Sequence, residues 1–358
     1  MDGLKGPEPS VLYSPYSRDL SHPADRRRFC WWAAQRGVSF TTRETGREKA
    51  VVLNPMSNLP RWFSSNRRHP RNQYRVFDLV DGYMAESPSP LRNWGRSLDR
   101  ILDGRFDRTY RPFLYWLKRA VTVSDVVVCA SPEQATLLRP LNPNVHAILD
   151  SHEDYPRLGS RIRNHDEYGI FWEGQAGTLG HLRSILPVLS SLGGKGRIRL
   201  NVATSPQMAR LGVSHLKTST ERYLSGAAGS DRIRVSVVEW SPESVRKAAE
   251  ASRVAIVPVS MSDAYARFKP ENRLLIAWRL GLPTVVTRTP SHERVLVKLD
   301  RAALCTGEDD WTEALERFRN QPASGYRQVQ LGQEYLELHH GPQHLLEKWD
   351  QVFATLFA

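Results

Sequence analysis

The sequence has few cysteines and no long apolar run. Cys30, Cys129 and Cys305 are far apart and odd in number, which argues against a disulfide framework and against a cysteine metal site. No stretch reaches the roughly 18 apolar residues that a membrane-spanning helix needs. The first residues also lack the apolar segment of a signal peptide. From these absences we expect a protein of the reducing cytoplasm.

Acidic residues are scarce in the first half of the chain. Residues 1–165 contain 26 Lys and Arg against 17 Asp and Glu, a net charge of +9, whereas residues 166–358 contain 24 against 21, a net charge of +3. Most of the total net charge of +12 therefore lies in the N-terminal half. A basic surface of this kind attracts anionic partners, such as a membrane face, a phosphorylated lipid or nucleic acid.

Two clusters of arginine carry much of this charge. The denser cluster consists of Arg61, Arg67, Arg68, Arg71 and Arg75, and the other is the run Arg26-Arg27-Arg28. Trp62 and Phe63 lie within the denser cluster, and such side chains can anchor a protein at a membrane interface. The pattern predicts a surface for a phosphorylated lipid or for peripheral contact with the inner face of an anionic membrane; a solvated arginine-rich face is the alternative. No helix-turn-helix, RNA-recognition or zinc-finger pattern accompanies it, so nucleic acid is not an expected partner.

Short apolar runs alternate with helical patterns along the whole chain. Candidate strands fall at residues 11–16, 50–55, 75–80, 125–130 and 145–149, and then at residues 168–172, 198–203, 233–240, 253–259 and 284–287. Many of these runs are apolar throughout, which is typical of parallel strands buried on both faces. With 358 residues the chain is long enough for two domains. We therefore expect a doubly wound α/β architecture.

Helix starts follow several of these strands. Ser21 would cap the first helix, Asp25 would lie in its first turn, and Gly37 would end it. Ser131 and Ser241 are each followed by proline at the first helical position, which also predicts a helix start.

One βαβ unit in the C-terminal half combines this architecture with two cations. A strand at residues 253–259 leads through a polar loop to a helical pattern at residues 274–280, which Gly281 ends. Lys269 and Arg273 lie where the loop meets the helix N-terminus. Two cations beside free backbone N–H groups suit a diphosphate; a surface Lys and Arg on an ordinary βαβ unit is the alternative.

This stretch also resembles a known family. Lys269-Pro-Glu-Asn-Arg273, followed by Gly281-Leu-Pro283, is similar to the KxxNR…GxP signature of GT-B glycosyltransferases of the glycosyltransferase 4/group 1 kind. Residues 124–133 and 145–152 resemble the end of the acceptor domain in that family. The resemblance implies two Rossmann-like domains that face each other across a cleft. Their expected ranges are residues 1–152 for the acceptor domain, 153–340 for the nucleotide-sugar donor domain, and 341–358 for a C-terminal helix that packs back on the N-terminal domain.

The resemblance implies a set of donor-binding residues in the C-terminal half. The set comprises Gly174, Gln175, Trp240, Lys269, Glu271, Asn272 and Arg273. Trp240 would contact the nucleotide base or only pack at a strand end, and Glu271 would face the sugar hydroxyls or solvent. The sequence departs from the family at Gln175, where many members have an arginine that binds the donor phosphates. It departs again at Ile276, where a second glutamate often contacts the ribose.

The catalytic base is the least defined part of the predicted site. Asp81 follows the strand at residues 75–80 and is the candidate that we favour, with His22, His152 and His181 as rivals. Metal ligands are not expected, because no paired-aspartate loop is present and the acidic residues at 308–310 suit a helix N-terminus. We expect no cofactor besides the nucleotide-diphosphate sugar as co-substrate.

Taken together, the residues and the resemblance predict a metal-independent glycosyltransferase. It would move a sugar from a nucleotide-diphosphate sugar to a hydroxyl of a glycan, a glycolipid or a lipid-linked intermediate, as in cell-surface polysaccharide biosynthesis. Such transfer needs neutralisation of the leaving diphosphate and deprotonation of the acceptor hydroxyl. The alternative is a non-catalytic GT-B relative that binds nucleotide sugar or acts as a partner subunit.

Overall fold

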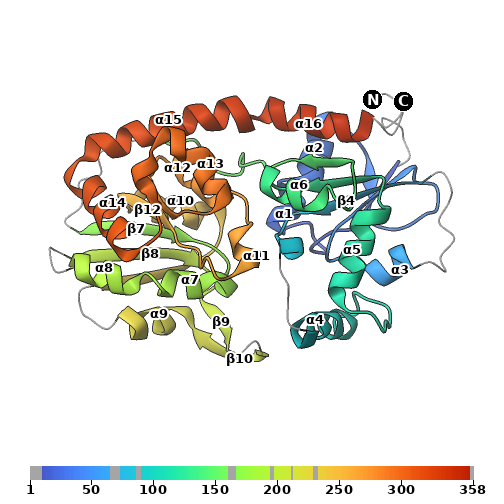
Figure 1. The fold of residues 1–358 in the computed structure, drawn as a ribbon, viewed down its shortest axis with the longest axis horizontal. Helices are drawn as coiled ribbons and strands as arrows, with labels where there is room; N and C mark the ends of the chain where they lie inside the picture. Colours follow the sequence, from blue (N-terminus) through green and yellow to red (C-terminus); the bar gives the residue numbers. More distant parts are fainter. Residues whose placement is uncertain are drawn as a thin grey trace. The chain divides into compact units, whose positions relative to one another are not determined.

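The computed structural model describes residues 10–64, 73–85, 90–159, 167–193, 197–210, 213–228 and 233–354. The chain divides into two compact units (Figure 1). Unit 1 comprises Met1–Ser151, Ala264–Pro270 and His340–Ala358, and unit 2 comprises His152–Asp263 and Glu271–His339. The short segment Ala264–Pro270, which contains Lys269, therefore belongs to unit 1, although the chain on either side of it belongs to unit 2. Within the described part of the chain, no helix is long and apolar enough to cross a membrane.

Unit 1 is built on a six-stranded parallel sheet with the order β2-β1-β3-β4-β5-β6. Its strands are β1 Val11–Tyr13, β2 Phe40–Thr41, β3 Ala50–Leu53, β4 Tyr74–Leu79, β5 Val126–Cys129 and β6 Val145–Ala147. Its helices are α1 Pro23–Arg26, α2 Phe29–Arg36, α3 Leu59–Phe63, η2 Tyr83–Ala85, α4 Pro90–Leu102, α5 Phe113–Val123, α6 Pro132–Leu138, α11 Ala264–Arg267 and α16 Pro342–Ala354. Since β3 and β5 are buried along their whole length, their uniformly apolar sequences are explained by cover on both faces.

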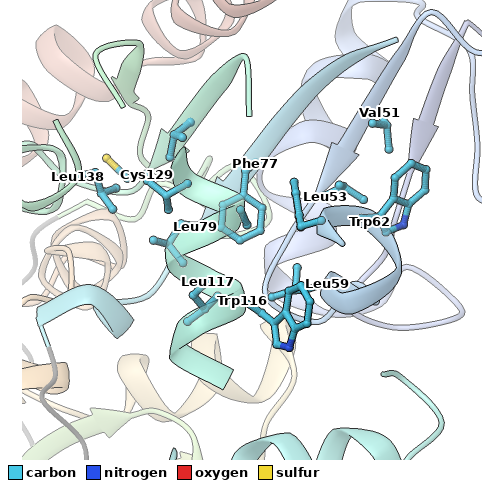
Figure 2. Close-up of a cluster of buried hydrophobic side chains, with 14 of the residues drawn as sticks. Val51, Leu53, Leu59, Trp62, Phe77, Leu79, Trp116, Leu117, Cys129 and Leu138 are labelled. Atoms are coloured by element: carbon cyan, nitrogen blue, oxygen red, sulfur yellow. The ribbon is translucent and has the colours of Figure 1, made fainter. Parts of the chain in front are cut away.

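The core on one side of this sheet corrects one expectation. Trp62 and Phe63 are only 6% and 2% exposed, and they pack with Leu53, Leu59 and Phe77 (Figure 2). Both lie on the short helix α3, which turns them towards the sheet. The prediction that they anchor the protein at a membrane interface is therefore wrong, because burial of large aromatic side chains stabilises the core instead.

The start of the first helix also differs from the prediction. His22, and not Ser21, is the N-cap, and its Nδ1 accepts a hydrogen bond from the N–H of Ala24 at 3.1 Å. The helical segment is divided into α1 and α2 at Arg27 and Arg28. Gly37 ends α2 as predicted, because its φ of 65° lies in the left-handed region that favours glycine.

The C-terminal helix α16 packs on α2 (Figure 1). The ring of Phe353 stacks on that of Trp32 with their centroids 4.4 Å apart, and Trp349 is buried beside them. At the edge of this contact, the carboxylate of Asp350 accepts hydrogen bonds from Trp32 Nε1 at 2.8 Å and from Arg36 at 2.6 Å. The last described helix thus completes the core of the first unit.

Unit 2 contains a second six-stranded parallel sheet, with the order β11-β8-β7-β12-β13-β14. Its strands are β7 Tyr168–Glu173, β8 Ile198–Thr204, β11 Ile233–Glu239, β12 Val254–Val257, β13 Thr284–Thr287 and β14 Leu304–Cys305. Its helices are η3 Ala176–Thr178, α7 Leu179–Arg183, α8 Leu186–Leu192, α9 Thr220–Ala228, α10 Pro242–Glu250, α12 Asn272–Arg279, α13 Pro290–Leu299, η5 Arg301–Ala303, α14 Glu308–Asn320 and α15 Pro322–His340. In chain order the strands run 3-2-1-4-5-6, which is the doubly wound Rossmann arrangement.

The predicted βαβ unit is present as β12, α12 and β13. Gly281 follows α12 with a φ of 73°, and a Cβ there would lie 2.7 Å from the carbonyl oxygen of Gly159. Glycine is therefore required twice over, for the backbone conformation and for the close approach. The antiparallel pair β9 Gln207–Arg210 and β10 Val213–Ser219 was not predicted.

Candidate active site

The strand order of unit 2 marks one edge of its sheet as the candidate binding edge. Successive strands progress outward from β7 on one side and from β12 on the other, so the order reverses between these two strands. In open parallel sheets, ligands bind beyond the carboxyl ends of the strands at such a reversal. Glu173 ends β7, and Pro258 follows β12. The predicted donor residues Gly174, Gln175 and Trp240 all follow carboxyl ends of strands in this sheet.

The turn after β7 is shaped by Gly174. A Cβ at this position would lie 3.0 Å from two ring atoms of Trp172 and 3.1 Å from the hydroxyl of Thr178. The missing side chain lets the turn pass close over the indole, and the next residue, Gln175, is exposed. The turn therefore brings its backbone to the surface of the binding edge, as a phosphate-binding turn requires.

Arg273 lies in the first turn of α12 and reaches back to the same strand end. Its guanidinium is 6.0 Å from the ring centroid of Trp172 and donates a long hydrogen bond of 3.5 Å to the carbonyl oxygen of Glu173. Burial lowers the pKa of Arg273, and the carboxylate of Glu173 opposes that shift. Even so, an arginine stays protonated at neutral pH. A half-buried cation thus stands beside the turn of β7.

Trp240 contacts this strand end from the other side. Its Nε1 donates a hydrogen bond of 3.2 Å to Oε2 of Glu173. The indole follows β11 and is half-buried. Glu173 therefore has Trp240 on its carboxylate and Arg273 on its carbonyl oxygen, so one residue links two of the predicted donor-binding side chains. The sequence analysis did not assign a role to Glu173.

Glu271 and Asn272 have partners within unit 2. Glu271 is 1% exposed, so the prediction that it faces solvent is wrong, and its Oε1 accepts a hydrogen bond of 2.8 Å from Arg294. It occupies the N-cap position of α12 without making a side-chain cap. Oδ1 of Asn272 lies 3.0 Å from Nε2 of His152. These contacts hold the start of α12 in place, which positions Arg273.

Lys269 and Asp81 lie together in unit 1. Nζ of Lys269 is 3.7 Å from Oδ1 of Asp81 and 4.9 Å from the centroid of the Tyr265 ring. The ring of Tyr265 in turn lies 5.1 Å from that of Tyr83. Burial is the main cause that raises the pKa of both tyrosines, and the negative charge of Asp81 adds to it. The cluster therefore combines a carboxylate, an ammonium group and two neutral phenols just beyond β4.

The segment Ala264–Pro270 is held on unit 1 by backbone contacts. Gln134 donates hydrogen bonds of 3.1 Å to the carbonyl oxygens of both Val80 and Phe268. The carbonyl oxygen of Tyr265 passes 2.7 Å from the position that a Cβ of Gly82 would occupy. Only glycine permits this approach without a shift of the backbone. Gln134 and Gly82 were not among the predicted residues, because their role depends on a contact between distant parts of the chain.

The three histidines that rival Asp81 have different surroundings. Nδ1 of His22 accepts the cap hydrogen bond, so the neutral ring carries its proton on Nε2 and cannot use Nδ1 as a base. Burial lowers the pKa of His22, and the carboxylates of Asp25 and Asp81 oppose that shift. His181 accepts a hydrogen bond of 3.1 Å from the N–H of Ser260, and His152 contacts Asn272. Asp81 therefore stays the favoured prediction.

A buried charge cluster supports the strands beside Asp81. The guanidinium of Arg28 is fully buried and pairs with Asp78 at 2.6 Å and with Asp150 at 3.0 Å. Burial raises the pKa of Asp78, and Arg28 opposes this. Arg27 is also buried, at 7% exposure, so the reading of Arg26-Arg27-Arg28 as a basic surface is wrong. Asp78 was the residue in the sequence that could have indicated this buried cluster, because a carboxylate inside a buried strand needs a partner.

The predicted arginine patch is described only in part. Arg61 is exposed and forms an ion pair of 2.8 Å with Glu44. Arg67, Arg68 and Arg71 lie outside the described residues. Among the residues that the structure describes, no group of three or more His, Cys, Asp or Glu is placed to hold a metal ion.

Comparisons with known proteins identify the fold. No family model and no curated protein matches the sequence. Three similar solved structures are TarM (10% identity, TM-score 0.61, 87% of this chain and 55% of TarM), WaaG (13%, 0.54, 96% and 98%) and OtsA (10%, 0.54, 86% and 73%). WaaG is described as a glycosyltransferase involved in lipopolysaccharide biosynthesis, and S. aureus TarM has been solved with UDP and α-GlcNAc-glycerol.

These likenesses extend over both units. The chain spans about half the length of TarM and almost all of WaaG. The two parallel sheets with their covering helices match the architecture of these GT-B structures. The fold that the sequence predicts is thus confirmed: this chain has the GT-B fold.

Proposed function

We propose that this protein is a glycosyltransferase that moves a sugar from a nucleotide-diphosphate sugar to an acceptor hydroxyl without a metal ion. One observation carries the proposal. In a chain with the GT-B fold, Arg273 stands at the first turn of α12 beside the carboxyl end of β7, where the strand order of unit 2 reverses. A fixed cation at that place suits the phosphates of a nucleotide.

The donor would lie along the binding edge of unit 2. Its diphosphate would be bound by Arg273 and by backbone N–H groups at the start of α12, where the helix dipole favours negative charge. The turn at Gly174 and Gln175 would follow the phosphates, and Trp240 would contact the base or ribose. Glu173 supports this arrangement by contacting both side chains. As the bond between the sugar and the diphosphate of the donor breaks, negative charge develops on the leaving diphosphate, and the cations would stabilise it.

The acceptor would bind to unit 1, with Asp81 as the base. A carboxylate can remove the proton of a hydroxyl when it lies within hydrogen-bonding reach of it. Nζ of Lys269 lies 3.7 Å from Oδ1 of Asp81, and the same cation would also support the leaving phosphates. The acceptor would be a glycan, a glycolipid or a lipid-linked intermediate. The scattered cysteines support a reducing compartment, which we propose to be the cytoplasm.

Nucleotide binding is the first test. A thermal-shift screen against UDP, GDP, ADP, TDP and CMP should raise the unfolding midpoint with one nucleotide more than with the others, because a ligand that binds only the folded state stabilises it. The corresponding nucleotide sugars would then be assayed for release of the nucleotide with a pool of acceptors. If no nucleotide raises the midpoint, the donor site is not where we place it.

A non-catalytic relative is the second candidate function, and two observations favour it. Gln175 stands where many relatives have an arginine, and Ile276 stands where a glutamate often contacts the ribose. Glu271, a candidate for the sugar hydroxyls, is buried and pairs with Arg294. Turnover separates the two functions: nucleotide binding without release of nucleotide from any donor would support the binding subunit.

A further inference from the structure

The exposed apolar side chains of this protein are concentrated on one short segment. Eight large hydrophobic residues are exposed in the described part of the chain, and five of them lie between residues 94 and 115. These five are Trp94 at 46%, Leu98 at 56%, Leu102 at 76%, Tyr110 at 95% and Tyr115 at 39% exposure. The segment comprises α4, the following loop and the start of α5, which lie side by side in unit 1 (Figure 1). We call these five side chains the α4 face.

Helix α4 is oriented with its apolar side outward. Trp94, Leu98 and Leu102 are spaced four residues apart, so they lie on one side of the helix. The other side carries arginine and faces unit 1: the guanidinium of Arg100 lies 3.9 Å from the ring centroid of Phe113, and that of Arg96 lies 5.5 Å from the ring of Tyr83. Burial lowers the pKa of Arg100. A helix that buries arginine and exposes tryptophan and leucine is the reverse of the usual surface helix.

The surroundings of the α4 face are basic. Residues 90–119 contain eight Lys and Arg against three Asp, a net charge of +5. Arg108, Arg111 and Lys118 are exposed, and the guanidinium of Arg111 lies 5.1 Å from the ring centroid of Tyr115. The three acids Asp99, Asp103 and Asp107 are exposed too, and Asp107 accepts a hydrogen bond of 2.8 Å from Asn58. Charge complementarity therefore calls for an anionic partner with an apolar interior.

Three kinds of occupant can be compared on this basis. A second copy of the chain would bring two segments of net charge +5 together across a symmetric contact, which like-charge repulsion opposes. Nucleic acid would pair with the arginines, but phosphate contacts leave Leu98 and Leu102 exposed to water. An anionic bilayer takes up tryptophan, tyrosine and leucine at its interface and attracts the cations around them. Of these three occupants, only the bilayer matches both the exposed apolar side chains and the cations around them.

We infer that the α4 face is a membrane-docking surface that inserts Trp94, Leu98 and Leu102 into the interface of an anionic bilayer. Arg108 and Arg111 bind the lipid headgroups beside them. The proposed surface is defined by residues other than those of the arginine cluster predicted from the sequence, and it does not depend on catalysis. Attachment is reversible, because a single amphipathic helix and a few cations hold a protein at the interface without spanning the bilayer.

Flotation with lipid vesicles tests this inference on the full chain. The protein should float with vesicles of phosphatidylglycerol and phosphatidylcholine at low salt, and less at high salt or with phosphatidylcholine alone. The variant Trp94→Ser/Leu98→Ser should reduce the partition coefficient by about tenfold or more, since it removes two interfacial side chains. Reversal at Arg108→Glu/Arg111→Glu should reduce it by at least about tenfold, because each cation is worth about fivefold near an anionic surface.

Matched controls isolate the surface. Leu338→Ser changes an exposed leucine of α15, and Arg222→Glu/Arg234→Glu reverses two exposed arginines of unit 2; neither should change flotation. All variants should keep the unfolding midpoint of the unmodified chain, because the changed side chains are exposed. The inference is overturned if the unmodified chain does not float, if the α4 variants float normally, or if only reversal of Arg67 and Arg68 releases the protein. It is also overturned if the chain is a dimer in solution that Trp94→Ser/Leu98→Ser dissociates.

Discussion

At the scale of single residues, Lys269 and Arg273 carry the proposed chemistry. Neither lies in a core, so Lys269→Ala and Arg273→Ala should leave the fold intact. Each should raise the activation free energy of transfer by about 2–4 kcal/mol, because a fixed cation is lost where negative charge develops. The measurement is kcat/KM with the donor that the nucleotide screen identifies. Lys247→Ala, at an exposed lysine of α10, is the control. Normal turnover in both variants would contradict the assignment of Lys269 and Arg273 to the donor site.

Arg28 tests the buried charge cluster. Arg28→Met should lower the free energy of unfolding by about 3–5 kcal/mol, because Asp78 and Asp150 would stay buried without their cation. Without that cation, the pKa of Asp78, already raised by burial, should rise further. Between its two pKa values, the Asp78 carboxyl keeps its proton in the folded state and has lost it in the unfolded state. The free energy of unfolding therefore falls as the pH rises from the lower pKa of the unfolded state to the higher pKa of the folded state.

Urea unfolding at two pH values measures both effects. The free energy of unfolding that Arg28→Met loses relative to the unmodified chain should be larger at pH 8 than at pH 5. Arg222→Met, at an exposed arginine, should have a negligible effect at either pH. An equal deficit at both pH values would mean that Arg28 stabilises the fold by packing and not by neutralising the carboxylates.

Gly82 tests the attachment of Ala264–Pro270 to unit 1. In Gly82→Ala the new Cβ would meet the carbonyl oxygen of Tyr265 at 2.7 Å, so the segment must shift away. We expect faster amide exchange in residues 264–270 and lower transfer activity, because Lys269 moves relative to Asp81. Gly95→Ala is the matched control, since a Cβ there meets nothing within 4 Å and alanine favours the helix. Unchanged exchange in Gly82→Ala would show that the segment is not held by this contact.

At the scale of elements, the contact of α16 with α2 should be a major source of stability. Trp349→Ala removes a side chain that is 1% exposed and packs among Trp32, Phe29 and Phe353. We expect a loss of about 3–5 kcal/mol in the free energy of unfolding, from lost burial and the cavity that remains. Chemical denaturation measures it, and His344→Ala, at an exposed position of the same helix, is the control. A loss below about 1 kcal/mol would mean that α16 docks weakly.

The elements also show how far sequence reasoning reaches. The strands of both sheets other than the two-residue edge strands β2 and β14 were predicted correctly, as were the helix starts at Ser131 and Ser241, because buried parallel strands and N-caps leave local patterns. The pair β9–β10 was missed, since Met208 and Ala209 give no clear alternation between apolar and polar residues. Trp62 and Arg28 have charged neighbours in the sequence, which is a pattern typical of exposed residues, yet both are buried. Their burial depends on a sheet that forms from distant segments.

The candidate site shows the same contrast between local sequence patterns and contacts that join distant segments. The glycines and cations around the candidate binding edge were recognisable from a linear motif. Contacts that join distant residues, such as Glu173 with Trp240 or Gln134 with Phe268, leave no such motif. Sequence patterns therefore indicated which residues form the candidate site, whereas the contacts that position them became visible only in three dimensions.

At the scale of the whole molecule, transfer should not need a divalent ion. Arg273 and Lys269 would neutralise the leaving diphosphate, which is the task that a metal performs in other transferases. Initial rates should therefore be the same with excess EDTA and with added Mg²⁺ or Mn²⁺. A rate that EDTA abolishes and Mn²⁺ restores would contradict the proposed mechanism and would call for a metal site that the described residues do not reveal.

The division of unit 1 into three chain segments has a consequence for biosynthesis. Its sheet is complete once residue 151 has been made, but Ala264–Pro270 and α16 are added only later in the chain. Until then Trp32 and Phe29 lack the cover of Trp349 and Phe353. On the ribosome the N-terminal half should therefore expose an apolar patch for as long as unit 2 is being synthesised. Nascent chains arrested just before residue 340 should thus bind chaperones more strongly than chains in which α16 has emerged.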